Sequence, residues 1–238
     1  MCELFGMSCQ SPVNGVAILS RFGELSASNP DGWGLAYYRD GRAIIEKEAI
    51  SASESPRFRR AIQDAVSRIF IAHVRSATQG EICTENCHPF RRSAFQRDWI
   101  FAHNGTIDDI PPHTLSGGTT DSERAFLRMI DDIEAYVHRS DFHGLYPGIK
   151  HSIRRLFERY SKNITFNFLL SDGSVLYAFN HYPEKPLFVS LREREGENAI
   201  AVSTSRLKSE DFPEWKKIPE ERVMLITDGR VLVLSDRL

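Results

Sequence analysis

Three Asp-Gly pairs, each lying between apolar runs, constrain the fold of this chain most strongly. The pairs are Asp40-Gly41 after the run that begins at Gly34, Asp172-Gly173 between Phe166–Leu170 and Val175–Phe179, and Asp228-Gly229 between Val223–Ile226 and Val231–Leu234. A type I′ turn needs a positive φ at both central residues, and Asp-Gly adopts this conformation readily. The sequence therefore predicts three antiparallel hairpins.

Apolar residues at helical spacing predict helices between these hairpins. Phe58, Ile62 and Val66 mark one face of a first helix, and Thr120 with Glu123 forms a capping box that begins a second. The apolar positions of the second helix are Ala125, Phe126, Met129, Ile130, Ile133 and Val137, and those of a third are Ile149, Ile153, Leu156, Phe157 and Tyr160. A short helix is also expected over residues 13–23.

Further strands are predicted where apolar runs lack helical spacing. Ile69–Val74 and Trp99–Ala102 should be buried on both faces, and a first strand is expected over Glu3–Met7. Residues 79–98 and 105–119 look like long loops, which in compact domains are often functional. Antiparallel hairpins with helices covering the sheet faces make an α+β layered architecture. Because no linker or internal repeat interrupts the pattern, we expect a single domain over residues 1–238.

The composition is that of an ordinary soluble globular protein. Hydrophobic residues make up 41% and charged residues 26%, and the net charge of −2 gives no reason to expect nucleic acid or an anionic membrane as a partner. No apolar run is long enough to span a bilayer, and no signal-peptide core is present. Four cysteines in 238 residues do not form a disulfide framework, so we expect a cytoplasmic protein.

Cys2 is the first candidate catalytic residue because it directly follows the initiator methionine. Removal of Met1 by methionine aminopeptidase would expose a residue with both a thiol and a free α-amine. The ordinary pKa values, about 8.5 for the thiol and about 7.7–8.0 for the amine, let the amine accept the thiol proton near neutral pH. Many proteins also carry a cysteine at this position without using it, so the case for a catalytic Cys2 depends on the other residues.

Two charged residues could each bind a charged group of a substrate, although each also has a purely structural interpretation. Arg75 ends an apolar strand, where a fixed guanidinium suits a carboxylate but could equally pair with a neighbouring acid. Asp121 stands at a helix start, where acids stabilise the helix N-terminus. Alternatively, Asp121 faces a cleft and binds an ammonium group.

Two glycine-containing turns and one cysteine pair could also carry chemistry. Asn104-Gly105 could supply an oxyanion hole from one side-chain amide and one backbone N–H, or could be an ordinary turn. Gly32-Trp33 lies in a turn where the backbone can approach another group closely, or where a tryptophan simply packs. Cys83 and Cys87-His88 lack a second ligand pair, so we expect neither a metal nor another cofactor.

The order of these motifs resembles that of the class II glutamine amidotransferases, a branch of the N-terminal nucleophile hydrolases. Cys2, His-x-Arg at 73–75, Asn-x-His-Pro at 86–89, His-Asn-Gly at 103–105 and Thr-Asp-Ser-Glu at 120–123 follow the family's order. The opening Met-Cys-Glu-Leu-Phe-Gly-Met-Ser and the Asp-Gly-Trp-Gly turn most resemble the small stand-alone YafJ-type members. The resemblance covers residues 2–123 and implies a four-layer αββα sandwich of two antiparallel sheets with flanking helices.

The resemblance also implies a role for each matching residue. Cys2 would attack the γ-carboxamide of glutamine with its own α-amine as base, and Asn104 and Gly105 would stabilise the oxyanion. Arg75 would bind the substrate α-carboxylate and Asp121 its α-ammonium, and water would release glutamate from the γ-glutamyl thioester. The other positions implied near the substrate are Ser76 and Thr78 on a loop that folds over glutamine, His88 as a loop organiser, and Gly32 and Trp33 in a turn lining the pocket.

Three functions stay open at this point. A glutaminase could pass its ammonia to a separate synthase, because larger members of the family fuse a synthase and we expect no room for one in 238 residues, or it could simply hydrolyse the amide. A γ-glutamyl amidohydrolase would act on a modified amine instead. A catalytically silent module would only bind glutamine or a partner. The intact set Cys2, Arg75, Asn104, Gly105 and Asp121 favours an enzyme.

Overall fold

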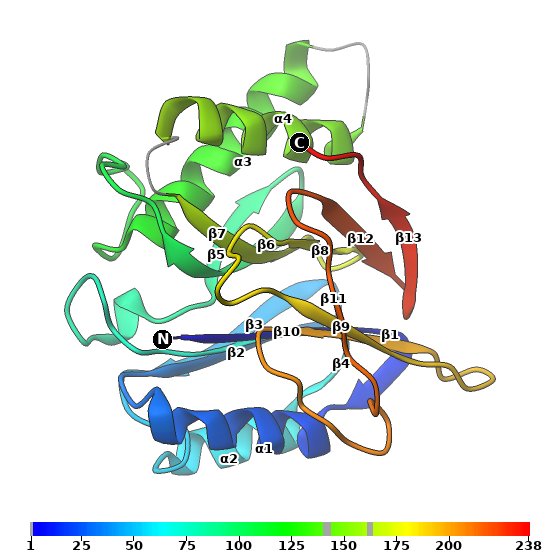
Figure 1. Ribbon diagram of the computed structural model, residues 1–238. Helices are drawn as coiled ribbons and strands as arrows, with labels where there is room; N and C mark the ends of the chain where they lie inside the picture. The colour runs from blue at the N-terminus through cyan, green and yellow to red at the C-terminus, as the bar shows by residue number, and fades with distance from the viewer. Residues whose placement is uncertain (1, 140–143, 161–163) are drawn as a thin grey trace.

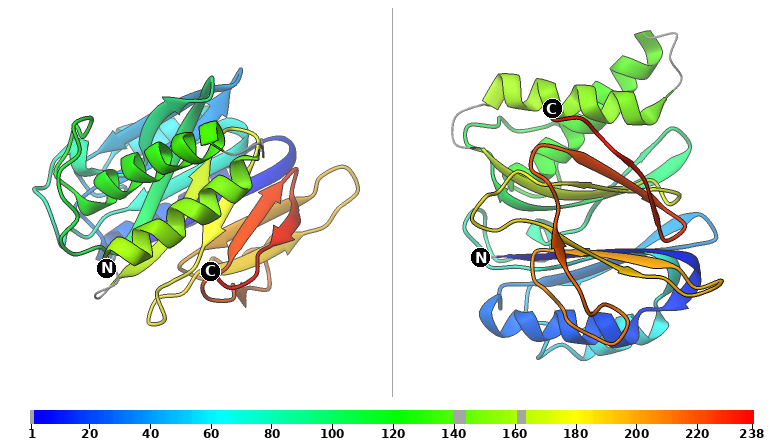
Figure 2. Two further views of the ribbon diagram at one scale, coloured as in Figure 1. Left: turned by 90° about the horizontal axis from the view of Figure 1, so that it is seen from above. Right: turned by 45° about the vertical axis from the view of Figure 1, so that its right-hand side comes forward.

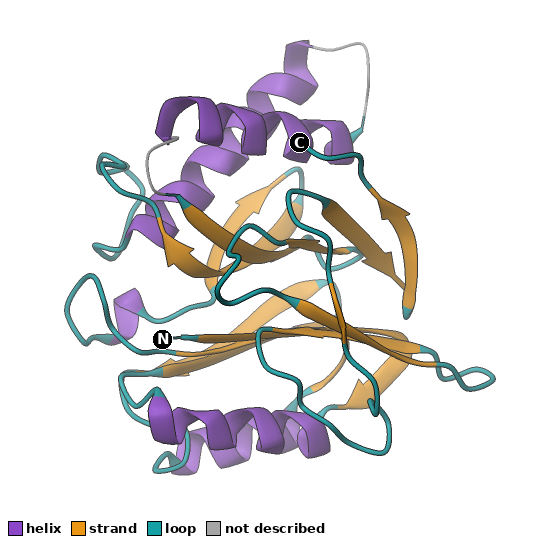
Figure 3. Cartoon of the chain, viewed as in Figure 1, coloured by secondary structure: helices purple, strands orange, loops and turns teal. Residues whose placement is uncertain are grey.

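Two antiparallel sheets lie face to face, and a pair of helices covers the outer face of each sheet (Figure 1, Figure 3). This arrangement is seen in a computed structural model, which describes residues 2–139, 144–160 and 164–238. The layers follow one another as helices, sheet, sheet and helices. The predicted α+β architecture, a four-layer αββα sandwich, is therefore confirmed.

The first sheet contains the N-terminal strand near its middle. Its strand order is β11-β9-β10-β1-β4-β2-β3. The strands are β1 (Glu3–Asn14), β2 (Trp33–Arg39), β3 (Arg42–Glu48), β4 (Val66–Val74), β9 (Phe188–Arg192), β10 (Ala199–Ser203) and β11 (Lys216–Lys217). In β1, Phe5 lies opposite Ala72 of β4 on one side and Ser203 of β10 on the other. Glu3 lies opposite Val74, so Cys2 lies beside the end of β4.

The second sheet has the strand order β13-β12-β8-β7-β6-β5. Its strands are β5 (Phe90–Ala94), β6 (Arg97–Thr106), β7 (Thr165–Ser171), β8 (Leu176–Phe179), β12 (Val223–Thr227) and β13 (Arg230–Leu234). Strand β6 lies between β5 and β7, with Asn104 opposite Asn167 and Gly105 opposite Phe166. The candidate oxyanion residues therefore belong to the last part of an interior strand.

Four helices form the outer layers of the described structure. They are α1 (Val16–Glu24) and α2 (Pro56–Asp64) on the first sheet, and α3 (Asp121–Arg139) and α4 (Leu145–Tyr160) on the second (Figure 1, Figure 2). Two short 3-10 helices, η1 (Leu25–Ser28) and η2 (Thr84–Asn86), lie in connecting segments. Among the residues described, no helix is long and apolar enough to cross a membrane.

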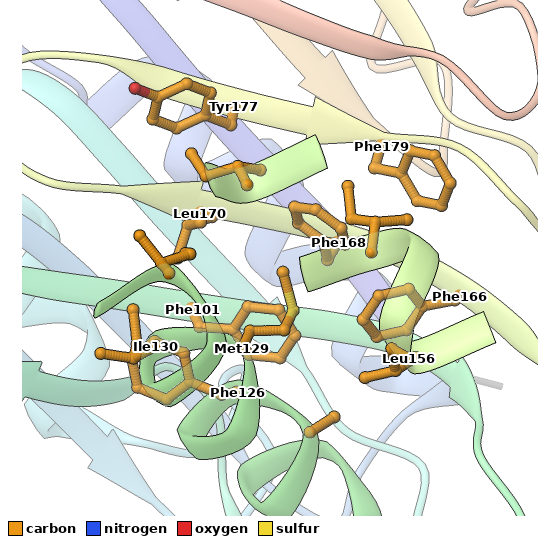
Figure 4. Close-up of a cluster of buried hydrophobic side chains, with 14 of the residues drawn as sticks. Phe101, Phe126, Met129, Ile130, Leu156, Phe166, Phe168, Leu170, Tyr177 and Phe179 are labelled. Atoms are coloured by element: carbon orange, nitrogen blue, oxygen red, sulfur yellow. The ribbon is translucent and has the colours of Figure 1, made fainter. Parts of the chain in front are cut away.

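Alternating side chains of the strands fill three separate core layers. Leu4 points into the layer between the two sheets, whereas Phe5 points into the layer between the first sheet and helices α1 and α2. The third layer lies between the second sheet and helices α3 and α4, where Phe101 of β6 stacks on Phe126 of α3 with 5.2 Å between ring centroids (Figure 4). Each sheet is therefore held on both faces.

All three Asp-Gly pairs connect antiparallel strands, which confirms the hairpins. Asp40 and Gly41 have φ values of 51° and 74°, and Asp228 and Gly229 have values of 48° and 67°. Both turns thus have the positive φ at two central residues that the sequence predicts.

The third turn has a different conformation. Among its residues, Gly173 has a positive φ, 89°, but Asp172 does not. The Asp172 carboxylate accepts hydrogen bonds of 3.0 Å from the backbone N–H groups of Ser174 and Val175, and it pairs with Arg97. The side chain of Asp172 therefore shapes a longer connection, and β8 begins at Leu176.

Several predicted boundaries need correction. Strand β1 continues to Asn14 rather than ending at Met7. Val66 does not lie on the first helix, because Ala65 is extended and Val66 begins β4 as an exposed residue. Part of the predicted loop 79–98 is ordered as η2 and β5, and strands β9 and β10 are not anticipated by the sequence analysis.

Candidate active site

Cys2 lies where three distant parts of the chain meet. Its Sγ atom is 3.3 Å from the backbone nitrogen of Ser76, which donates to it, and 3.3 Å from the backbone oxygen of the same residue. The side-chain amide of Asn104 donates a hydrogen bond to the Cys2 carbonyl oxygen. The segment before β1, the segment after β4 and the end of β6 are thus joined at Cys2.

Burial of Cys2 raises the pKa of its thiol above the ordinary value. The backbone N–H of Ser76 and the positive charges of Arg75 and Lys185 act in the opposite direction. On balance the thiol stays protonated near neutral pH. A nucleophilic role would therefore need a base close to the sulfur atom.

Arg75 extends from the end of β4 with a buried guanidinium group. It donates to the backbone oxygens of Gln79 at 2.9 Å, Gly80 at 3.4 Å and Glu81 at 3.0 Å. Within residues 2–139, 144–160 and 164–238, no carboxylate lies within ion-pair distance of it. The alternative of an arginine paired with a neighbouring acid is therefore not what is observed, and the charge could serve an external anion.

Asp121 is the first residue of α3, and its carboxylate is buried. One oxygen accepts a 2.8 Å hydrogen bond from the backbone N–H of Ile107, and the other accepts one of 2.8 Å from the N–H of Ser122. These bonds correspond to the structural interpretation, in which the carboxylate fixes the helix start. They also attach the segment after Gly105 to α3. The Ser122 hydroxyl also donates to it at 3.3 Å, and since a carboxylate has about four acceptor positions, it has room for a further donor.

Asn86 joins the loop that holds Arg75 to the loop that precedes Asp121. Its side-chain amide donates to the Glu81 carbonyl at 3.0 Å and to Thr119 Oγ1 at 3.2 Å, and its oxygen accepts from the Thr119 N–H at 2.8 Å. Both loops lie on the side of the molecule where β1 begins (Figure 1, Figure 2). Asn86 belongs to the Asn-x-His-Pro motif, which is the signal by which this bridging role could have been found.

Asn104 and Gly105 occupy the end of β6 beside β7. Gly105 has a φ of 146°, and a Cβ atom there would lie 1.9 Å from the carbonyl oxygen of Thr165. Only glycine fits this conformation and this close approach. Asn104 is buried, and because its amide has two N–H groups, one remains beyond the bond to Cys2.

Ser76 and Thr78 lie on the segment that follows Arg75. The backbone of Ser76 contacts the Cys2 thiol, while Thr78 is exposed. Between them, the N–H of Ala77 donates to the carboxylate of Asp31 at 2.8 Å. The segment is thus tied to the turn before β2.

Gly32 and Trp33 have different environments in the structure. The Gly32 carbonyl accepts a 2.7 Å hydrogen bond from the Arg75 N–H, so this turn supports the end of β4. The Trp33 side chain is fully buried and packs edge-on against Phe58 of α2, 5.1 Å between ring centroids. The tryptophan ring therefore lies in the core layer between the first sheet and helices α1 and α2, away from the Cys2 thiol.

His88 belongs to a buried group of three histidines. Its ring centroid lies 4.3 Å from that of His73 and 6.5 Å from that of His103. Burial lowers the pKa of His73 to about 3 and that of His88 well below its ordinary value. His103 Nδ1 lies 2.8 Å from the hydroxyl of Ser122, next to Asp121. These rings are uncharged at neutral pH. They pack together between His73 of β4 in the first sheet and His103 of β6 in the second.

A solved structure shows the same arrangement of layers. The glutamine phosphoribosylpyrophosphate amidotransferase from B. subtilis, complexed with ADP and GMP, matches 97% of this chain and 48% of its own with a TM-score of 0.69 and 16% identity. At this identity the likeness concerns the fold. The chain thus has the N-terminal nucleophile hydrolase fold, in which two antiparallel sheets are flanked by helices.

The chain belongs to the class II glutamine amidotransferases, because the sequence profile of that family matches residues 1–194. "Putative glutamine amidotransferase YafJ" of Escherichia coli is 31% identical over 188 residues, which cover 75% of this chain and 72% of the relative. A "Putative glutamine amidotransferase" of Haemophilus influenzae is 34% identical over 192 residues and covers 75% of this chain. The chain spans 62% of the length of the Haemophilus protein.

Proposed function

We propose that this protein hydrolyses the side-chain amide of glutamine, with Cys2 as the nucleophile. The observation that carries the proposal is that Cys2 is held at two points, its thiol by the Ser76 backbone and its carbonyl oxygen by the Asn104 amide. Next to Ser76 lies a buried Arg75 that pairs with no acid among the described residues. Membership of the family supports the same reaction. We also propose that residues 1–238 act as one domain.

The proposed reaction begins with proton transfer from the Cys2 thiol to the α-amine of the same residue. Met1 lies outside the described residues, and the amine exists only after Met1 is removed. The thiolate attacks the amide carbon of glutamine, and the carbonyl electron pair moves onto oxygen. The second N–H of Asn104 and the backbone N–H of Gly105 would stabilise this oxyanion.

The tetrahedral intermediate then collapses by breaking the carbon–nitrogen bond. The α-ammonium group of Cys2 returns its proton to the leaving nitrogen, which departs as ammonia. Water adds to the resulting γ-glutamyl thioester with the amine as base, and cleavage of the carbon–sulfur bond releases glutamate and the thiol. We propose that the ammonia is either released or used by a separate synthase.

The α-carbon of glutamine carries both a carboxylate and an ammonium group, so its binding site needs one fixed cation and one fixed anion. We propose that Arg75 binds the α-carboxylate of glutamine and Asp121 its α-ammonium group, with the loop of Ser76 and Thr78 folding over it. The three backbone carbonyls that accept from Arg75 hold the guanidinium in place without neutralising it. The link through Asn86 keeps the segments of both charged residues on one side of the molecule.

The test combines intact mass with covalent labelling. Protein without Met1 is incubated with 6-diazo-5-oxo-norleucine, a reactive glutamine analogue, and glutamate release from glutamine is measured in parallel. We expect one adduct mapped to Cys2, turnover of glutamine, and loss of both in Cys2→Ala. Release of amines from γ-glutamyl amides without glutamine turnover would instead support the γ-glutamyl amidohydrolase. Neither label nor turnover in folded, Met1-free protein would support the silent module.

A further inference from the structure

Glu3, the residue after the candidate nucleophile, forms an ion pair with Lys185. The Lys185 Nζ atom is 2.7 Å from Glu3 Oε1, and each side chain is only 12% exposed. The other carboxylate oxygen accepts hydrogen bonds from the hydroxyl groups of Thr204 at 2.6 Å and Ser205 at 2.9 Å. Both carboxylate oxygens of Glu3 are thus bound by side chains that lie 182 to 202 residues later in the sequence.

Lys185 is fixed by the strand next to the candidate oxyanion residues. It lies in the connection between β8 and β9, and its carbonyl oxygen accepts a 2.6 Å hydrogen bond from the side chain of Asn167. Asn167 also accepts from the N–H of His181 at 2.9 Å, and it lies opposite Asn104 in the β6–β7 register. The backbone of Lys185 is therefore tied to β7, the strand beside β6.

The charges around Cys2 come from several elements. Arg75 and Lys185 both lower the pKa of the Cys2 thiol, against the larger effect of burial, which raises it. Other titratable groups near this end of β1 and β4, among the described residues, include the uncharged histidines His73, His88 and His103, the Asp121 carboxylate that acts on His103, the Asp31 carboxylate bound to Ala77, and Glu3 itself. Glu3 is the carboxylate closest in sequence to the nucleophile.

We propose that the Glu3–Lys185 ion pair sets the proton affinity of the N-terminal nucleophile, with Lys185 as a positioning residue for Glu3. The proposal rests on the proposed function of Cys2. A carboxylate one residue from an α-amine favours the ammonium form, which cannot accept the thiol proton. Lys185 offsets this charge and, with Thr204 and Ser205, holds the carboxylate in one place. The amine is thereby available as a base at neutral pH.

The two partners should have opposite effects on the nucleophile. In Lys185→Met the negative charge of Glu3 is left uncompensated, so the pKa values of the thiol and the α-amine rise, by about one unit for a neighbouring charge. In Glu3→Gln one negative charge next to the nucleophile is removed while Lys185 keeps its charge, so both pKa values fall by a similar amount. The double variant lacks both charges and should resemble wild type.

The experiment measures how fast Cys2 is alkylated by iodoacetamide from pH 5 to pH 10. It uses full-length protein without Met1, verified by intact mass, and peptide mapping separates Cys2 from the other cysteines. Lys185→Arg, which keeps the charge, should retain the wild-type profile. Lys217→Met, which removes a cation from an exposed pair with Glu220, serves as the matched control. Glutamine turnover is recorded over the same pH range.

Opposite shifts in the two single variants, with near cancellation in the double variant, would support the proposal. Shifts in the same direction, or no shift in either, would overturn it, because a purely structural role gives no sign reversal. If Lys185→Met does not fold, the downward shift expected of Glu3→Gln decides alone. Alkylation needs no glutamine, so wild-type protein that is alkylated at Cys2 but releases no glutamate contradicts the proposed function without affecting this test.

Discussion

The side-chain amide of Asn104 donates a hydrogen bond to the backbone carbonyl of Cys2, and this bond crosses from one sheet to the other. Asn104 lies at the end of β6, whereas Cys2 directly precedes β1. The proposed nucleophile and the proposed oxyanion donor are therefore aligned only while the two sheets keep their packing. The proposed chemistry would therefore depend on the packing between the two sheets as well as on the side chains themselves.

Replacement of Arg75 by lysine should weaken glutamine binding although the charge is kept. Lysine cannot reach the carbonyl oxygens of Gln79, Gly80 and Glu81 while also presenting two parallel donors to a carboxylate. We expect kcat/KM for glutamine to fall on the order of 10–100-fold, which corresponds to about 1.5–3 kcal/mol for a charged hydrogen bond. Steady-state kinetics checks this, with the exposed Arg68→Lys as control. An unchanged KM would remove Arg75 from the binding site.

Replacement of Asp121 by asparagine should separate a structural role from a binding role. The amide keeps one acceptor oxygen for two backbone donors, so the free energy of unfolding should fall by about 1–3 kcal/mol. Binding of the substrate ammonium would show differently: wild type should prefer glutamine to its analogue without the α-amine, and Asp121→Asn should lose that preference. Urea unfolding and the two KM values measure these effects. Retained preference for glutamine would leave Asp121 with the structural role alone.

Alanine at Gly105 should destabilise the protein far more than alanine at a glycine in an open turn. The added Cβ would overlap the Thr165 carbonyl at 1.9 Å, and the residue would be strained at a φ of 146°. Gly41 is the matched control, since it has a φ of 74° but nothing within 4 Å of its Cβ position. We expect a loss of about 1 kcal/mol at Gly41 and of more than roughly 3 kcal/mol at Gly105. Equal losses in chemical denaturation would contradict this account.

Acidification should destabilise the fold through the buried histidines. In the folded protein the pKa of His73 is about 3, and that of His88 is also lowered, whereas an unfolded histidine titrates at about 6.5. The unfolded state therefore binds more protons below about pH 6.5. Stability is complete above that pH and is lost as the pH falls toward the folded values, by up to about 1.4 kcal/mol per pH unit for each histidine.

Unfolding free energies measured by denaturant at pH 7, 6 and 5 test this slope. Replacement of His88 by glutamine should reduce the slope by about one proton, even if it also lowers stability at pH 7. The exposed His138→Gln variant is the control for replacing a histidine that is not buried. A wild-type slope in His88→Gln would mean that other groups control the acid response.

Local sequence signals were sufficient to locate the helices and hairpins, although not all of their boundaries, but they did not reveal every strand. Helix α3 starts as the predicted cap indicates, since the Glu123 N–H donates to Thr120 Oγ1 at 3.3 Å. The Glu123 carboxylate, however, accepts from the N–H groups of Gly117 and Gly118, so only half of the predicted capping box is observed. Strands β9 and β10 are each five residues long and are not connected by an Asp-Gly turn, so nothing local distinguished them from loops. Strand β10 joins the sheet by pairing with β1, which lies almost two hundred residues earlier, and β9 then pairs with β10.

The candidate site shows the same division between local and distant information. Cys2, Arg75 and Asn104 stand in motifs that can be found in the sequence alone. The Glu3–Lys185 pair cannot, because its partners are 182 residues apart and Lys185 lies in no motif. For Trp33 the motif can be found in the sequence, but the sequence does not show which face of the first sheet its ring lies on.

The central position of β1 has a consequence during protein synthesis. Phe5 pairs with Ser203, and Leu4 bonds to Thr204, so the strand that follows Cys2 is fully enclosed only after the ribosome has made most of the chain. Until then the nascent N-terminus is open to the aminopeptidase that would remove Met1. Domains generally fold as complete units during translation, so the order of synthesis would separate removal of Met1 from assembly of the proposed site around Cys2.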